Sequence, residues 1–152
     1  MPERVFLMMS EHLEEEAEAL LGEFPEAGLE LCGCCSYGHK DIARMIKGAG
    51  PDIIVLTADD DVGMGIALML ASLVHRFCEE GFSGKIYPCT LNDQVNSGLG
   101  DFFSCEKPMK GKQADPDFQG FLDRHMTNPS REAHLMPIYC IVFEVLQSGK
   151  LH

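Results

Sequence analysis

Short runs of mostly apolar residues recur along most of the chain. They lie at residues 4–9, 29–35, 52–57, 85–89 and 101–105. A run of this kind predicts a strand that is buried on both faces of a sheet. We therefore expect a strand at each of these places, with helices in the segments between them.

The segments between the runs carry apolar residues at helical spacing. The first forms one face of a helix from Leu13, Ala17, Leu20, Leu21 and Phe24. A shorter helix begins near residue 41 and is stopped by Gly48 and Gly50, and a long helix spans roughly residues 62–80. Strands that alternate with helices predict an α/β fold, namely a doubly wound, flavodoxin-like parallel sheet with helices on both faces.

The net charge removes two classes of partner. Lys and Arg number 12 against 24 Asp and Glu, which gives a net charge of −12 at pH 7. Such a field repels phosphate backbones and anionic lipid surfaces, so we expect neither nucleic acid nor a membrane as partner. No uncharged run reaches the about 20 residues that cross a bilayer, and no basic segment precedes the first apolar run. We expect a cytoplasmic protein.

The chain contains seven cysteines, an odd number that does not suit a secreted disulfide framework. Cys32, Cys34, Cys35 and His39 are close enough in sequence to suggest zinc, but zinc knuckles usually place paired cysteines on turns. A regular strand would point Cys32 and Cys34 to one face and Cys35 to the other. We expect mostly buried thiols and no metal, with Cys34 and Cys35 as the candidate reactive thiols.

Several segments carry a resemblance to a known family. They are the stretch Leu29–Gly38, the pair Pro51-Asp52 at the start of the third strand, Thr90 at the end of the fourth, and Lys107-Pro108 after an aromatic strand. Together with the order of elements over residues 4–108, they resemble the receiver domains of bacterial response regulators, the CheY-like family of two-component signalling. The resemblance implies a five-stranded, doubly wound sheet whose carboxyl edge carries a phosphorylation pocket.

The chain departs from this family at the residues that perform phosphoryl transfer. Receivers close the first strand with an acidic pair that binds Mg²⁺, and here the two positions are Met9 and Ser10. The phospho-accepting aspartate is replaced by Thr57. These side chains lack the carboxylate oxygens that Mg²⁺ and the transferred phosphoryl group require. The resemblance therefore implies a degenerate pocket, without catalysis, metal or cofactor, lined by Met9, Ser10, Thr57, Thr90 and Lys107.

Carboxylates follow the ends of two predicted strands. Glu11 comes just after the first strand, and Asp59, Asp60 and Asp61 come just after the third. They lie beyond the positions from which phosphoryl transfer is catalysed in receivers, and that chemistry tolerates little misplacement. We regard them as candidate weak contacts for a cation or ligand.

The chain continues beyond the receiver-like core at residues 1–109. Residues 110–129 are interpreted as a polar linker and a displaced last helix that begins at Pro116. Residues 130–152 contain an apolar run for which strand and helix are both open. A receiver has no vacant face for this run, so we expect it to dimerise the protein or dock a partner, the alternative being that it packs on its own sheet. The expected interface residues are Leu135, Ile138, Tyr139, Val142, Phe143 and Leu146.

The sequence supports hypotheses from different functional classes. The first is a non-enzymatic pseudo-receiver that regulates a signalling pathway through protein contacts and independently of phosphorylation. The second is a small-molecule- or metal-binding flavodoxin-like module that uses the crevice at the strand ends. The third is a thiol redox sensor that uses Cys34 or Cys35.

Overall fold

The computed structural model describes residues 2–9, 11–36, 41–56, 84–88, 116–128 and 135–150, together with Ser72, Arg76, Glu79 and Gly81. Its strands are β1 (Glu3–Met8), β2 (Leu29–Cys35), β3 (Ile53–Leu56) and β4 (Lys85–Pro88). Its α-helices are α1 (Glu14–Gly22), α2 (Ile42–Ala49), α5 (Pro116–His125) and α7 (Met136–Lys150). Two short 3-10 helices, η1 (Glu11–Leu13) and η2 (Pro25–Ala27), flank α1.

The four described strands form one parallel sheet in the order β2-β1-β3-β4. Each of them coincides with a predicted apolar run, and α1 and α2 connect the first three. The predicted α/β fold with a parallel sheet is therefore confirmed. Ser72, Arg76 and Glu79 are helical, as expected for the long helix predicted at 62–80. The strand predicted at 101–105 lies outside the described residues.

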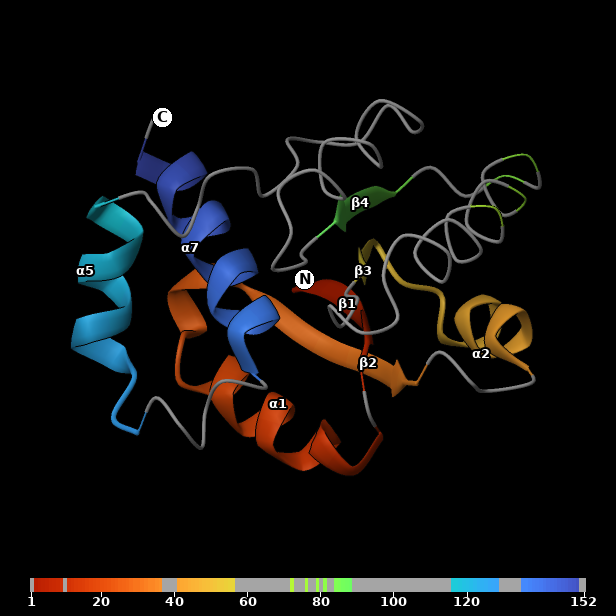
Figure 1. The fold of residues 1–152 in the computed structure, drawn as a ribbon. Helices are drawn as coiled ribbons and strands as arrows, with labels where there is room; N and C mark the ends of the chain where they lie inside the picture. Colours follow the sequence, from red (N-terminus) through yellow and green to blue (C-terminus); the bar gives the residue numbers. More distant parts are fainter. Residues whose placement is uncertain are drawn as a thin grey trace.

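The sheet separates two hydrophobic cores, because successive side chains of a strand point to opposite faces. One face is covered by α1, α5 and α7 and the other by α2 (Figure 1). We call the core on the first face the α1-side core and the core on the second face the α2-side core. The strands β1, β3 and β4 contribute to the α1-side core Val5, Leu7, Ile53, Val55 and Tyr87. They contribute to the α2-side core Phe6, Met8, Ile54, Leu56 and Ile86.

The apolar segment 135–146 agrees with the alternative that the sequence analysis left open, because it packs within the chain's own fold. It lies in a helix, α7, that packs in the α1-side core. Leu135 and Leu146 are half-buried. The other expected interface residues are buried in the chain's own core, with exposed fractions of 1% for Ile138, 1% for Tyr139, 0% for Val142 and 4% for Phe143. These four side chains are therefore unavailable as an exposed interface, because the sheet face beside α1 receives this segment, and dimerisation stays a prediction.

Helix α5 packs against α7 on the α1 side of the sheet. It lies outside α7, which stands between α5 and the sheet (Figure 1). Aromatic rings hold it there: the centroid of Phe118 lies 5.3 Å from that of Phe143, and that of Phe121 lies 5.5 Å from it. At its end, the His125 ring lies 5.0 Å from Phe24, after α1. Although α7 is apolar, no helix in the described ranges is long and apolar enough to cross a membrane.

A β-bulge interrupts the pairing of β1 with β2. Val5 pairs with Leu31, but the next residue, Phe6, pairs with Gly33, so that Cys32 is the extra residue. A Cβ atom on Gly33 would lie 2.6 and 2.8 Å from two atoms of the Phe6 ring. Gly33 is therefore required for the close approach of this ring to the strand.

Arg4 joins three elements at the amino edge of the sheet. Its backbone N–H donates to Asp52 Oδ2 at 3.0 Å, and its Nη2 donates to the carbonyl of Ala49 at 2.8 Å, at the end of α2. The backbone of Asp52 continues the ladder, because its N–H donates to Arg4 O and its carbonyl accepts from the Lys85 N–H. Asp52 thus has a structural role at the edge opposite to the carboxyl ends of the strands.

The position of α7 predicts the effect of truncating one of its side chains. Ile141→Ala should lower the free energy of unfolding by about 2–5 kcal/mol, because Ile141 is fully buried in the α1-side core. Urea unfolding followed by circular dichroism measures it. Gln147→Ala on the same helix should change stability by less than about 0.5 kcal/mol. An Ile141→Ala variant that keeps its stability but changes its oligomeric state would instead show that α7 forms an interface.

The contact between Gly33 and Phe6 predicts a second stability effect. Gly33→Ala should destabilise the protein by about 1–3 kcal/mol, because the new methyl group collides with the ring. Phe6→Leu should recover part of this loss in the double variant, which a double-mutant cycle in urea measures. Gly48→Ala is the control: nothing lies within 4 Å of its added Cβ, and alanine in a helix gains about 0.5–1 kcal/mol over glycine. Additive effects of the two core substitutions would contradict the proposed collision.

Candidate functional site

The carboxyl ends of the parallel strands meet at one edge of the sheet, where ligands bind in open α/β folds. Among the described residues at this edge are Met8 at the end of β1 and Met9 after it, Cys35 at the end of β2 and Ser36 after it, and Leu56 at the end of β3. With the exception of Ser36, which is half-buried, all of them are buried. The described part of the candidate site is therefore apolar and rich in sulfur.

Two sulfur contacts join β1 to β2 at this edge. The Cys35 Sγ donates to Met8 Sδ at 3.7 Å, and both side chains have an exposed fraction of 0%. The Cys34 Sγ donates to the carbonyl of Met9 at 3.5 Å. The parallel register explains the first contact, because Met8 pairs with Cys35. The sequence analysis missed Met8, which the register of two adjacent buried strands would have indicated.

Met9 is the residue of the predicted degenerate pocket whose surroundings are described. Its side chain has an exposed fraction of 7% and packs in the α1-side core, whereas Met8 packs in the α2-side core. A thioether in this environment offers no hard oxygen ligand, and Mg²⁺ binds oxygen. The Met9 side chain thus contributes to packing in the core.

The structure describes Met9 but not the other residues of the predicted pocket. Ser10, Thr57, Thr90 and Lys107 lie outside the described residues, as do Asp59, Asp60 and Asp61. Glu11 begins η1, directly after the end of β1 in the chain. Their roles as pocket residues or as weak contacts for a cation or ligand stay predictions.

The β-bulge changes the arrangement of the cysteines. Cys32 and Cys35 contact the α2-side core and Cys34 contacts the α1-side core, so Cys32 and Cys34 do not share a face as predicted. The prediction failed because the extra residue at Cys32 shifts the alternation of the strand by one position. Within the described ranges, no group of three or more His, Cys, Asp or Glu side chains is placed to hold a metal ion.

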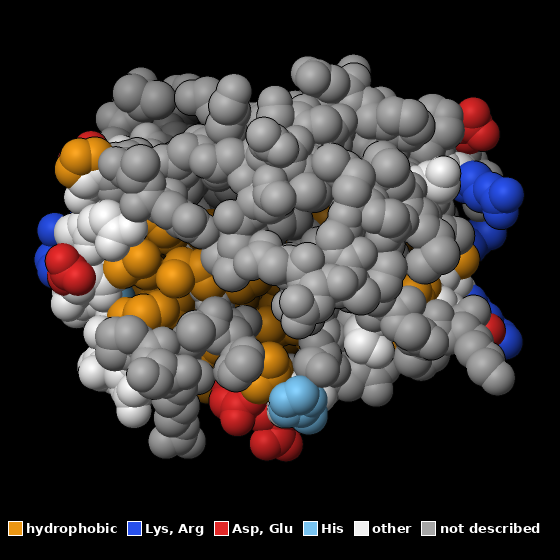
Figure 2. Space-filling view, in the orientation of Figure 1, with side chains coloured by type: hydrophobic (Ala, Val, Ile, Leu, Met, Phe, Trp, Pro, Cys, Tyr) orange, Lys and Arg blue, Asp and Glu red, His pale blue; other side chains and the backbone are white. Residues whose placement is uncertain are grey.

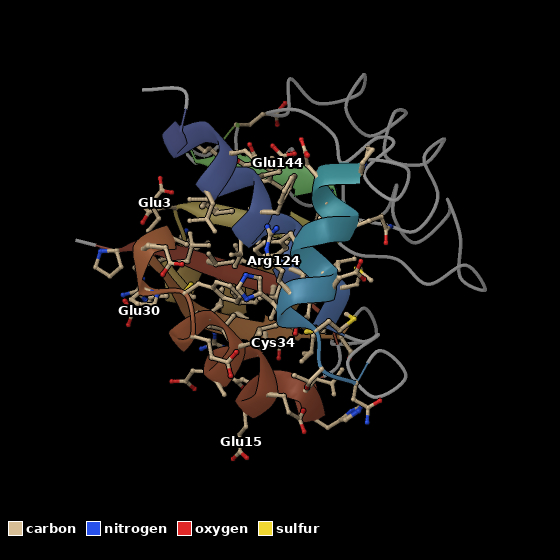
Figure 3. The ribbon with its side chains drawn as sticks, turned by 90° about the vertical axis from the view of Figure 1, so that its left-hand side faces the viewer. Glu3, Glu15, Glu30, Cys34, Arg124 and Glu144 are labelled. Carbon is tan, nitrogen blue, oxygen red and sulfur yellow. The ribbon has the colours of Figure 1, made fainter. Side chains whose placement is uncertain are left out.

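Burial argues against Cys34 and Cys35 as reactive thiols. Their exposed fractions are 3% and 0%, and Figure 3 shows Cys34 inside the fold, whereas Glu15 and Glu30 point away from it. A sensor thiol must be accessible to its oxidant and must ionise readily. These two cysteines therefore do not support the redox hypothesis.

Cys32 is the most accessible of the three cysteines on β2. Burial raises the pKa of its thiol above the usual value of 9.0, and the nearby Arg4 guanidinium opposes this by lowering the pKa. The folded state therefore holds the thiol proton more tightly than the unfolded chain does. The contribution of this thiol to the free energy of unfolding is fully present below pH 9.0. It declines as the pH rises through the higher pKa of the folded state.

Acidic side chains lie on the outer face of α1. Glu14, Glu15, Glu16 and Glu18 are exposed, and acidic side chains gather at the end of the molecule where α1 lies (Figure 2). The opposite face of the helix buries Ala17, Leu20 and Leu21. The helix is therefore amphipathic, with a solvated acidic face.

Comparison with known proteins adds no family to this description. The chain matches no protein-family model, and no curated protein matches it.

The cysteines on β2 predict a pattern of chemical labelling. In the native protein, iodoacetamide should modify Cys32 before Cys34 and Cys35, because only Cys32 is half-exposed. Fragmentation mass spectrometry of the peptide that contains all three measures this order. Arg4→Gln should slow labelling of Cys32 at a given pH, because loss of the guanidinium raises the thiol pKa further. Faster labelling of Cys34 or Cys35 than of Cys32 would contradict the burial described above and revive the redox hypothesis.

Proposed function

We propose that this chain is a receiver-like α/β module that works through protein contacts and has lost phosphoryl transfer. In this proposal residues 101–105 form a fifth strand beside β4 and complete a doubly wound, flavodoxin-like sheet. The module is not an enzyme and regulates a partner protein in a signalling pathway. Two observations support this function: the sequence resemblance to receivers, and the apolar side chains at the end of β1.

The order of the strands supports the receiver-like part of the proposal. A flavodoxin-like sheet has the strand order 2-1-3-4-5. The described order β2-β1-β3-β4 agrees with the first part of that series, and every described pairing is parallel. Because this topology also hosts unrelated functions, the strand order alone does not decide between them.

The burial of Met8 and Met9 at the end of β1 is the observation that carries the proposal. Phosphoryl transfer at this edge would need a cation between carboxylates, since the transferred group is highly charged. The two methionines instead contribute apolar side chains to the two cores, and their neighbours on β2 are thiols. Replacement of the acceptor aspartate by Thr57 has the same consequence, because a neutral hydroxyl forms no acyl phosphate.

The loss of phosphoryl transfer is tested with acetyl phosphate and Mg²⁺. Intact-mass spectrometry should find no phosphorylated protein, and beryllofluoride should leave the amide resonances at the ends of β1 and β3 unchanged. Thr57→Asp is the matched variant, and it should also remain unlabelled, because the end of β1 still lacks carboxylates. An acid-labile phosphoaspartate in the wild type, or efficient labelling of Thr57→Asp, would overturn the proposal.

The protein-contact part of the proposal is tested in the native host. Crosslinking of the tagged full-length chain in cells should yield a defined complex with another protein. The same complex should form in similar yield with the Thr57→Ala variant, because no phosphorylation is involved. A complex that requires Thr57, or one that forms only after treatment with a phosphodonor, would show instead that the pocket has a signalling chemistry of its own.

A further inference from the structure

We draw no further inference here: the strongest candidate, the apolar surface that Met136, Val145 and Leu146 leave half-buried along α7 (Figure 2), carries nothing because nothing in the structure shows what covers it.

Discussion

The structure depends on the burial of β1 on both of its faces. This strand lies between β2 and β3, and the side chains from Val5 to Met8 are at most 1% exposed. Each face supports a separate core. The side chains of one core therefore do not substitute for those of the other. A polar residue in this run would therefore leave an unpaired group in one of the cores, which costs more than the loss of one contact. The same constraint extends to Met9, which is 7% exposed and packs in the α1-side core.

Much of the fold could be predicted because the strands are short, continuous and apolar. The runs at β1, β2, β3 and β4 can be recognised in the sequence, because a strand that is buried on both faces shows no regular alternation of apolar and polar residues. The position of α7 could not be predicted in this way. Its apolar residues suit an interface, a strand or a core helix equally well, and only the space beside α1 decides between them. Of the two glycines expected to stop α2, Gly50, with a φ of 59°, ends the helix, whereas Gly48 lies within it.

The candidate site was harder to predict than the fold. Sequence reasoning identified Met9 as a departure from an acidic pocket, and its burial agrees with that interpretation. It did not find the contact between Met8 and Cys35, because a contact between strands requires their register. It also placed Cys34 on the wrong face, since a single extra residue in β2 reverses the alternation beyond it. Gly33 was the available signal for this irregularity, because glycine inside a strand often accompanies a bulge or a close approach.

The sulfur atoms at the edge of the sheet weigh differently against each hypothesis. A redox sensor needs an accessible thiol, yet the Cys34 and Cys35 thiols are buried. A soft metal ion would accept thiolate and thioether ligands. Within the described ranges, however, Cys35 and Met8 supply only two such ligands and both are buried, so this pair alone has neither the ligand number nor the entry path of a metal site. A packing role explains both contacts without further assumptions. Within the described residues, the side chains at the ends of β1 and β2 therefore stabilise the edge of the sheet.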